Sequence, residues 1–466
     1  MTVKTIFPMT RIHEPMKVDV DLQNGKVADA WIGATLFRGF EAMMIGRDPR
    51  DAALFTQRIC GICSSAHAVV ASMALQQAYK VEPPPNGQII TNLIFAADII
   101  QNHLRHFYLL LLLDYVKGPD YPPYTPRLDG DYRLPKKIND QMMEHHKDAV
   151  VKSARAHEML AVFGAKIPMQ QTIMTTGVTE KASAERILAY SAILKELAEW
   201  VDNVYLPDAM TIAEYYKDYY NIGSGYGNFI SYGLFPQPIT AKLEFAPGII
   251  KNKGSVEPLD LSKVGEEIKY SWYKDTAPSS PLFEGQTVPD RDKEGAYSWV
   301  KAPRYDGLPF EGGPLARGWI NGDYRRGISV MDRIVARALE TKKICRLAAG
   351  WLEQLTHHGP TLTPFTPPMD GDGVGLTDAM RGPLGHWVSV RNGKIRHYQI
   401  VTPTTWNFSP RDSSGRRGPV EEALVGTQVA KSESLIEVGR VIRSLDPCFT
   451  CAVHIIDAPK AASYPQ

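Results

Sequence analysis

Cysteine is scarce in this chain, with 5 among 466 residues. A disulfide framework is therefore not predicted, because disulfide-stabilised domains are small and rich in cysteine. An excess of one charge is lacking too, since 52 Lys and Arg residues balance 51 Asp and Glu residues and leave a formal net charge of +1. This balance predicts no electrostatic attraction to nucleic acid or to an anionic membrane surface.

Long uncharged apolar runs are also missing. The most apolar stretch, residues 89–116, contains Asp98, His103, Arg105 and His106. Such polar side chains favour a buried core helix over a membrane span. The first eleven residues lack the basic start and apolar run of a signal peptide, so the sequence by itself predicts a cytoplasmic chain. We see no internal repeat or low-complexity segment.

The few cysteines are concentrated in two pairs at opposite ends of the chain. Two residues between paired sulfurs allow a tight turn to direct both at one metal ion about 2.3 Å away. Four thiolates that meet in space would form a soft metal site. The two Cys-x-x-Cys pairs, each followed by a histidine, are Cys60 and Cys63 with His67, and Cys448 and Cys451 with His454.

A structural zinc site is the simplest interpretation of four such thiolates. Zinc-binding pairs usually stand about 15–20 residues apart. Here most of the protein separates Cys63 from Cys448. A chain of 466 residues can also bury a large core without a metal to hold it together. Zinc remains open as an alternative at this point.

The residues around the cysteines form longer motifs. The first is Arg58-x-Cys60-Gly61-x-Cys63-x-x-x-His67, and the second is Asp446-Pro447-Cys448-x-x-Cys451-x-x-His454. Further blocks stand, in order, at residues 37–41, 47–51, 302–307, 313–317, 381–387 and 403–407. Together these blocks resemble the large subunits of nickel–iron hydrogenases, and they look closest to the respiratory uptake group.

Apolar periodicity predicts a mainly α fold of the α+β class, with a bundle of long helices, an N-terminal β-hairpin region and small peripheral sheets. Asn24-Gly25 and Asn392-Gly393 are typical hairpin turns. We expect one catalytic domain over residues 1–454, with an extended N-terminus to residue 40, an irregular insertion at about 221–325 and a strand at 239–245. The expected helices lie at residues 65–80, 90–117, 137–163, 180–220, 328–357 and 420–444.

The resemblance implies a nickel–iron centre whose iron carries carbon monoxide and cyanide. All four cysteines would bind nickel, and Cys63 and Cys451 would bridge to iron. The other side chains that it places around the centre are His67, Arg381, Pro383 and Thr404. An isolated arginine is more often a surface charge, but beside a metal a guanidinium can orient and polarise H2.

The implied reaction is reversible heterolytic cleavage of H2, which yields a hydride equivalent and a proton. Cys448 is the expected first proton acceptor, and Arg381 is the alternative. The family then uses a glutamate after an Arg-Ile or Arg-Val pair, whereas this chain has His13 followed by Glu14. Either residue could carry the proton if its pKa is perturbed. Both could instead lie in a surface turn before Pro15.

Three further features follow from the resemblance. Asn102 stands where many relatives carry an acid or a hydroxyl, so the partner of Arg381 is in doubt. Glu41 and His454 would hold a magnesium or similar divalent ion, although each could equally be a buried hydrogen-bonded side chain. Residues 455–466 would be a propeptide that a maturation endopeptidase removes after nickel insertion, or else a frayed tail.

The fifth cysteine, Cys345, cannot hold an iron–sulfur cluster alone, since a cluster needs about four ligands. An iron–sulfur small subunit is therefore the expected partner, with nickel-insertion proteins during assembly and a membrane cytochrome b or another electron acceptor. An export signal on that subunit would place the complex in the periplasm or at the membrane, with the cytoplasm as alternative. The remaining functional alternatives are a hydrogen sensor, a zinc protein and a redox-complex subunit without the chemistry.

Overall fold

The N-terminal segment forms an antiparallel sheet of three strands, β1 (Thr2–Ile6), β2 (Met16–Gln23) and β3 (Lys26–Ala34). The computed structural model describes residues 2–238, 240, 242–274 and 288–452. The β2–β3 turn has positive φ at both Asn24 and Gly25, which confirms the expected hairpin.

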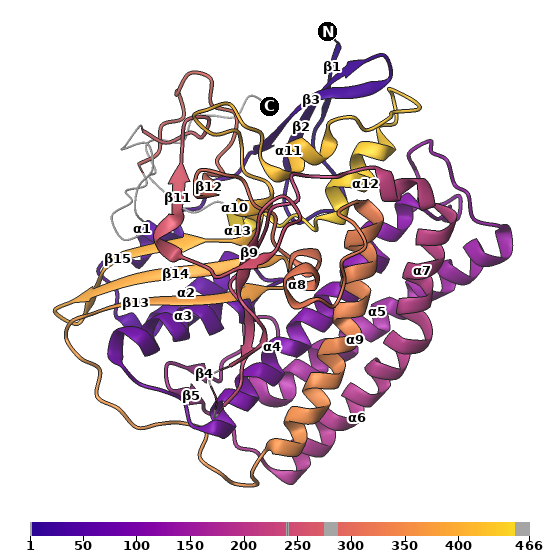
Figure 1. Cartoon of the computed structure of the whole chain (residues 1–466). Coiled ribbons are helices and arrows are strands. Elements are labelled where there is room, and N and C mark those ends of the chain that lie inside the picture. Colours follow the sequence, from indigo (N-terminus) through magenta and orange to yellow (C-terminus); the bar gives the residue numbers. More distant parts are fainter. Residues whose placement is uncertain (1, 239, 241, 275–287, 453–466) are drawn as a thin grey trace.

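Long helices pack side by side to form the core (Figure 1). They are α4 (Pro85–Arg105), α5 (Lys136–Gly164), α6 (Ala184–Trp200), α7 (Leu206–Tyr215) and α9 (Val330–Gln354). The start of α9 is set by a capping box, in which the side chains of Ser329 and Asp332 satisfy backbone N–H groups of the first turn. The mainly α, α+β fold is thereby confirmed.

Three of the expected helices are not single α-helices. The helix expected at 90–117 is α4 followed by a π-helical segment at His106–Leu111 and a 3-10 turn at Leu112–Asp114. The expected helix at 180–220 is α6 followed by a π-helical turn at Val201–Tyr205, α7 and a 3-10 turn at Lys217–Asn221. The expected helix at 420–444 is wrong over its middle, because it consists of α11 (Pro419–Leu424) and α12 (Ile436–Ser444). Between them Gly426 and Leu435 have positive φ, which a continuous right-handed helix does not allow.

A second sheet lies against α3 (Ser64–Tyr79) and consists of β13 (Gly371–Ala379), β14 (Gly382–Arg391) and β15 (Lys394–Val401). Glycines of β13 face the helix at close range. A Cβ atom at Gly373 or Gly375 would lie 2.0 Å from the carbonyl oxygen of Ala74 or Val70. The strand therefore rests directly on the helix backbone. The second expected hairpin turn, Asn392-Gly393, is confirmed between β14 and β15.

The insertion at about 221–325 holds short strands in small sheets, namely β6 (Phe229–Ser231), β7 (Leu234–Pro236), β8 (Leu243–Phe245), β9 (Gly248–Ile250), β10 (Val256–Glu257), β11 (Val264–Glu267) and β12 (Ala302–Tyr305). Of the expected strand at 239–245, residues 239 and 241 lie outside the described part, and its end is β8. The remaining short elements are α1 (Phe40–Met44), α2 (Ala52–Thr56), β4 (Ile173–Met174), β5 (Gly177–Val178), α8 (Pro314–Asn321), α10 (Pro403–Asn407) and α13 (Phe449–Ala452).

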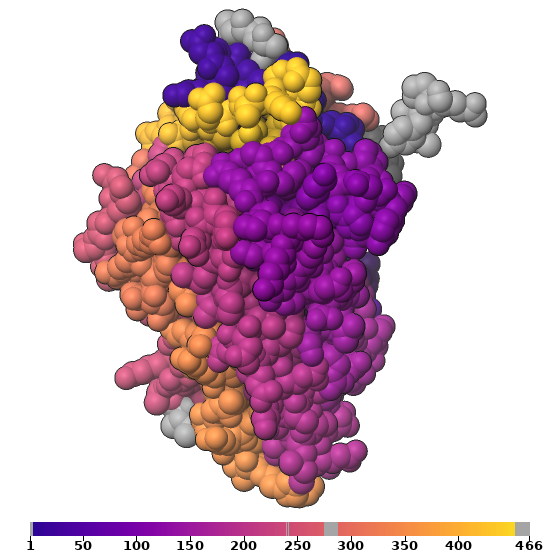
Figure 2. Space-filling view, turned by 90° about the vertical axis from the view of Figure 1, so that its right-hand side faces the viewer, coloured from indigo at the N-terminus to yellow at the C-terminus, as the bar shows by residue number. Residues whose placement is uncertain are grey.

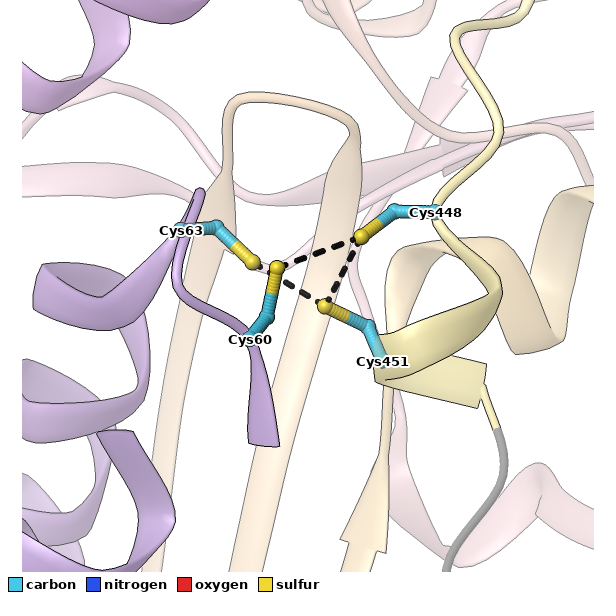
Figure 3. Close-up of side chains that lie close together, drawn as sticks. All are labelled: Cys60, Cys63, Cys448 and Cys451. Carbon is cyan, nitrogen blue, oxygen red and sulfur yellow. Dashed lines mark hydrogen bonds between the residues drawn. The ribbon is translucent and has the colours of Figure 1, made fainter. Parts of the chain in front are cut away.

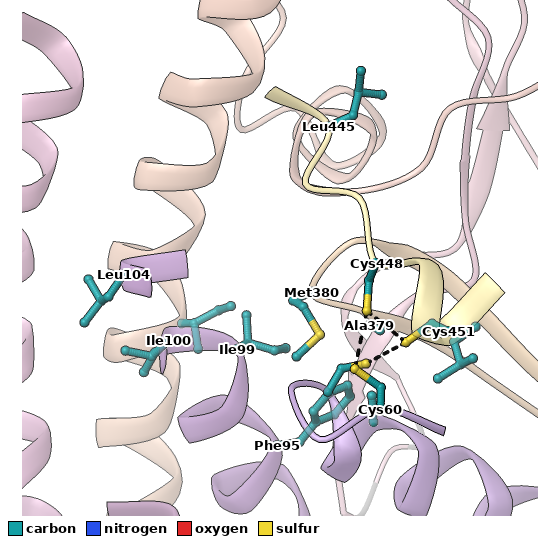
Figure 4. Close-up of a cluster of buried hydrophobic side chains, with 14 of the residues drawn as sticks. Cys60, Phe95, Ile99, Ile100, Leu104, Ala379, Met380, Leu445, Cys448 and Cys451 are labelled. Carbon is teal, nitrogen blue, oxygen red and sulfur yellow. Dashed lines mark hydrogen bonds between the residues drawn. The ribbon is translucent and has the colours of Figure 1, made fainter. Parts of the chain in front are cut away.

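The N-terminal and C-terminal segments meet at one end of the molecule, where the yellow segment lies beside the indigo one in Figure 2. The backbone N–H of Val27 donates to the carbonyl of Thr427 at 3.0 Å. A parallel bridge joins His13 to Cys448. These contacts bring the two cysteine pairs into one core cluster. Figure 4 shows Cys60, Cys448 and Cys451 within it. Within the described ranges, no helix combines the length and apolar character that a bilayer span requires.

Candidate metal centre

The four paired cysteines meet in the core with their sulfurs directed at one another (Figure 3). All four Sγ atoms lie within 4.8 Å of each other, and each residue is buried. The Sγ–Sγ distances are 3.0 Å between Cys63 and Cys451, 3.3 Å between Cys60 and Cys448, and 3.3 Å between Cys448 and Cys451. Across the described residues, no other group of His, Cys, Asp or Glu side chains forms such a candidate metal site.

Each pair is held by a tight local structure. Cys60 follows a 3-10 turn, and Cys63 is the N-cap of α3. The N-terminal end of a helix favours a thiolate through its dipole. At the other end of the chain, Cys448 precedes α13, and its carbonyl accepts the N–H of Cys451 at 3.1 Å. Both pairs therefore have their sulfurs placed by backbone geometry.

The electrostatics of the cluster favour a bound cation. Burial opposes ionisation of Cys60, but hydrogen bonds from the neighbouring thiols hold its pKa well below the usual value. Hydrogen bonding to Cys448 raises the pKa of Cys63, and burial raises that of Cys451. Without a metal, the cluster thus keeps protons on some of its sulfurs. A divalent or trivalent metal would compensate the charge of full deprotonation, so the donor set fits a thiophilic metal centre.

Arg381 lies at the bend between β13 and β14 and is buried. Its Nη2 donates to Asn102 Oδ1 at 2.6 Å, and its Nε lies 3.1 Å from Asp446 Oδ1. Asn102 in turn donates to Asp446 Oδ2 at 2.9 Å. Residue 102 is therefore a hydrogen-bond partner of Arg381 even though it is an asparagine and not an acid or a hydroxyl. Burial would raise the pKa of Asp446, but the Arg381 guanidinium holds it far below its usual range.

Arg381 also retains an unsatisfied donor. Its buried Nη1 has no hydrogen-bond partner among the described residues. An orphaned buried donor carries a free-energy penalty unless a further group accepts its hydrogen. The charges of Cys448, Cys63 and Cys60 act on the same guanidinium. This arrangement fits a small acceptor bound beside the sulfurs.

The other expected pocket residues are all buried. Thr404 Oγ1 accepts the backbone N–H of Cys448 at 3.0 Å. Pro383 lies at the start of β14, against Gly312, where a Cβ atom would be 2.1 Å from its Cδ. His67 lies one helical turn after Cys63, and burial lowers its pKa to about 4. Thr404 thus orients the backbone of Cys448, and Pro383 forms part of a tightly packed wall.

The structure separates the two candidates for the proton relay. His13 is buried, its backbone N–H donates to the carbonyl of Pro447 at 3.4 Å, and its carbonyl accepts the N–H of Phe449 at 3.0 Å. Burial, reinforced by the charge of Arg381, lowers its pKa to about 3. Glu14 is exposed. The bridge to Cys448 therefore draws residue 13 towards the cluster, and residue 14 faces solvent.

Glu41 lies beside a second group of charges. A cavity of about 10 Å³ is lined by Glu41, Glu266, Tyr273, Lys301, Ile400, Thr405 and Ala452. Glu41 Oε1 accepts the N–H of Ile400 at 2.9 Å. Burial would lower the pKa of Lys301, but the carboxylates of Glu266 and Glu41 raise it. The excess of carboxylates fits a small hard cation. His454 and residues 455–466 lie outside the described part of the chain.

Sequence reasoning missed two residues that support the cysteines. The guanidinium of Arg38 donates to the carbonyls of Ile59 and Thr450, so it connects the two cysteine loops. Arg38 lies in the same sequence block as Glu41, three residues before it, and this position could have indicated that Arg38 belongs to the site. Asp98 accepts the N–H of Ser65 at 3.2 Å at the start of α3, and burial raises its pKa to about 7. The sequence analysis used Asp98 only as a charged residue that argues against a membrane span.

Comparison with known proteins gives a consistent result. The family model described as nickel-dependent hydrogenase matches residues 38–127, 119–325 and 321–454. The chain is 37% identical to the periplasmic [NiFeSe] hydrogenase large subunit of Desulfomicrobium baculatum, over 97% of this chain and 95% of that protein. It is 30% identical to the uptake hydrogenase large subunit of Rhodobacter capsulatus, over 97% and 95%.

Solved structures agree. The Ni-Fe-Se hydrogenase of D. vulgaris Hildenborough in the reduced state superposes with a TM-score of 0.94 at 40% identity, over 97% of this chain and 100% of that one. A reduced, active form of the Ni-Fe-Se hydrogenase from Desulfomicrobium baculatum gives a TM-score of 0.94 at 37% identity, over 97% and 100%. The family match favours a nickel–iron centre over structural zinc. The chain therefore belongs to the nickel-dependent hydrogenase family, as a large subunit that acts on H2.

Proposed function

We propose that this chain is the catalytic subunit of a nickel–iron hydrogenase that works mainly in H2 uptake. The observation that carries the proposal is the meeting of four buried thiols from both ends of the chain beside Arg381, a guanidinium with an unsatisfied Nη1. Soft ligands suit nickel and low-valent iron, and a buried positive charge stabilises developing negative charge in a water-poor site.

The four cysteines would hold the metals, with Cys63 and Cys451 as the bridging pair and Cys60 and Cys448 bound to nickel alone. The shortest Sγ–Sγ distance, 3.0 Å, joins Cys63 to Cys451, which supports their placement between two metals. When bound, the nickel–iron centre supplies the acceptor for the two electrons of H2.

Carbon monoxide and cyanide on iron would occupy the space bordered by Arg381, Pro383, Thr404 and His67. Arg381 Nη1 is a buried donor in need of an acceptor, which a cyanide nitrogen would provide. Pro383 has no backbone N–H and presents an apolar wall. The hydroxyl of Thr404 accepts the Cys448 N–H, so its own hydrogen remains available to a ligand.

Cys448 Sγ would take the proton released from H2, with Arg381 as the alternative acceptor. His13 would receive the proton next at Nε2, which is buried and has no hydrogen-bond partner in the described part of the chain. The low basicity of buried His13 keeps it neutral at rest, so it would carry a proton only in transit. Exposed Glu14 would then release the proton to solvent.

A divalent cation such as magnesium would lie near Glu41. The neighbouring carboxylate of Glu266 supplies a second hard oxygen donor group. His454, beyond the described residues, would be a further ligand. Lys301, 3.1 Å from Glu266, would balance the remaining negative charge. We expect this ion to support the fold around Ala452 rather than to take part in the reaction.

An iron–sulfur small subunit would remove the electrons, since relatives are named as large subunits and large chains. The fifth cysteine supports this need for a partner, because Cys345 is buried on α9, away from the cluster. Nickel-insertion proteins and an endopeptidase that removes residues 455–466 would act during assembly, and a membrane cytochrome b would accept electrons. A relative named as periplasmic supports a periplasmic or membrane-associated location.

Infrared spectroscopy of the purified large–small complex tests the proposal. We expect bands from metal-bound carbon monoxide and cyanide, together with nickel, more iron than nickel because the clusters of the small subunit add iron, and H2-dependent reduction of an electron-accepting dye. Active, mature protein without these bands would contradict a nickel–iron centre. Bands accompanied by very slow turnover would instead indicate a hydrogen sensor.

A further inference from the structure

Asp114 is a buried carboxylate that binds one arginine from each end of the chain. It lies at the end of the 3-10 turn Leu112–Asp114. Its Oδ1 accepts a hydrogen bond from Nη2 of Arg11, and its Oδ2 accepts one from Nη1 of Arg443, in α12, at 2.6 Å. The side chains of Asp114 and Arg443 are at most 1% exposed, and that of Arg11 is 23% exposed. These three residues form what we call the carboxylate junction.

Both arginines of the junction also hold main-chain atoms close to His13. Arg443 donates from Nε and from Nη2 to the carbonyl oxygen of Thr10, at 3.2 and 3.0 Å. Arg11 donates from Nη1 to the carbonyl oxygen of Leu110 at 2.9 Å. The backbone that leads into His13 is therefore attached to α12 and to the segment that follows α4.

The loop between β1 and β2, which carries His13, needs such support. Arg11 and Glu14 have φ values of 57° and 73°, and left-handed backbone costs free energy at residues other than glycine. The main-chain bonds of His13 to the C-terminal segment are the 3.4 Å bond to Pro447 and the 3.0 Å bond from Phe449, and the first of them is long. The position of the loop against the second cysteine pair thus depends on contacts beyond this bridge.

The junction is held together by charge. Burial would raise the pKa of Asp114, but the guanidinium groups of Arg11 and Arg443 hold it below its usual value. Burial lowers the pKa of Arg443 to about 10, which leaves this side chain charged at neutral pH. A buried guanidinium that lost its carboxylate would be strongly unfavourable. The two chain segments therefore stay attached to the same carboxylate.

We propose that Asp114 is a positioning residue that places His13 beside Cys448 through its contacts with Arg11 and Arg443. Arg11 stands just before His13 in the sequence, and Arg443 stands just before Cys448, so the carboxylate fixes both sides of the His13–Cys448 bridge. The inference rests on the proposed function, in which Cys448 passes a proton to His13. A proton acceptor must lie within hydrogen-bond reach of its donor, so a loosened loop would slow this step.

The test compares Arg11→Gln with Arg186→Gln. Arg186 also binds one carbonyl and one carboxylate, those of Val162 at 2.6 Å and Glu180 at 2.7 Å, but it lies on α6. Each variant therefore loses the same kinds of contact. Arg11→Gln leaves the fully buried ion pair of the junction in place, so we expect this variant to fold.

Hydrogen–deuterium exchange of backbone amides reports the position of the loop in the full chain without metal. In Arg11→Gln we expect exchange about tenfold faster in peptides that contain His13 or Phe449, because a charge-assisted contact that holds the loop is lost. In Arg186→Gln these peptides should exchange as in the wild type. Unchanged exchange in the Arg11 variant overturns the inference, and so does faster exchange spread over the whole chain.

The metal-loaded complex separates position from reaction. Arg11→Gln should lower the rate of exchange between D2 and water by about tenfold, with normal nickel content and an unchanged KM for H2. Arg11→Lys keeps a positive charge beside Asp114 and should restore most of the rate. Faster amide exchange combined with normal D2–water exchange in both Arg11→Gln and His13→Ala would overturn the proposed proton relay alone, because the amide result does not require the metal.

Discussion

Asn102 and Asp446 are joined by a hydrogen bond of 2.9 Å from Nδ2 to Oδ2. The amide oxygen of Asn102 accepts from Arg381 at the same time. An amide can donate to a carboxylate with its nitrogen while its oxygen accepts from a guanidinium, which an ionised carboxylate cannot do. Asn102 thus links the arginine beside the sulfurs to the acid before Cys448.

Asn102→Asp should destabilise the chain at high pH, because it replaces the donor facing Asp446 with a second carboxylate. We expect the free energy of unfolding to fall by about 1–3 kcal/mol at pH 8. The new pair should share a proton as the pH falls, so the loss should shrink towards pH 5. Urea unfolding at both pH values measures this. Asn92→Asp is the control, since Asn92 donates to the neutral carbonyl of Pro236; equal pH slopes in both variants would contradict the argument.

His13→Ala should reduce H2 oxidation by at least about 10²-fold, because a positioned proton acceptor contributes that much. Nickel and iron contents should stay normal, since His13 is not a proposed ligand. Glu14→Gln should have a small effect, because Glu14 is exposed and solvent can replace it. Hydrogen–deuterium exchange between D2 and water follows the proton step directly. Normal rates in both variants would show that the relay runs elsewhere.

Cys60→Ser should abolish nickel binding, because a hard hydroxyl replaces a soft thiolate among the four sulfurs. Cys345→Ser is the matched control: Cys345 is also buried, but it lies on α9 outside the cluster. Metal analysis of the purified complexes measures the difference. Nickel retained in the Cys60 variant would exclude that residue as a ligand.

Glu421 should make stability decrease as the pH rises. Burial raises its pKa to about 7, above the value of about 4.3 for an unfolded chain. Between these values the folded state binds the extra proton, so stability is lost as the pH approaches 7, by up to about 3 kcal/mol. Glu421→Gln should flatten the pH profile of unfolding. The same change at the neighbouring Glu422, which is only partly buried, should not.

Mass spectrometry of active enzyme should show a chain that ends at His454. Loss of residues 455–466 is expected once nickel is inserted. Protein from cells grown without nickel serves as the control and should keep its full mass. Active protein that retains these residues would show that no propeptide is removed.

Much of the fold follows from local sequence signals. Asn24-Gly25 and Asn392-Gly393 occupy the turns that their dipeptides predict, since only a few residue types adopt positive φ without strain. The helix expected at 420–444 failed because apolar spacing persists through a loop, while Gly426 and Leu435 take left-handed conformations. Periodicity detects the buried face but not the backbone break.

In the candidate site, too, local motifs could be predicted from the sequence, whereas contacts between distant segments could not. The cysteine motifs predicted that residues 60–63 and 448–451 meet, and they do. The burial of His13 and the exposure of Glu14 could not be predicted from the sequence, because they depend on a backbone bridge to a residue near the other end of the chain. The hydrogen bond of 2.8 Å between His386 Nδ1 and the hydroxyl of Tyr398 depends likewise on the register of β14 and β15.

The glycines of β13 have a consequence for how this protein can change over evolution. At Gly373 and Gly375 the distance between sheet and helix is set by main-chain atoms in contact, which every sequence shares. Substitutions among the surrounding apolar side chains can alter volume and rotamers without moving α3 away from the sheet. The distance from the sheet to α3, and with it the position of His67, is therefore insensitive to substitutions among the neighbouring side chains. A single methyl group added at either glycine would change it.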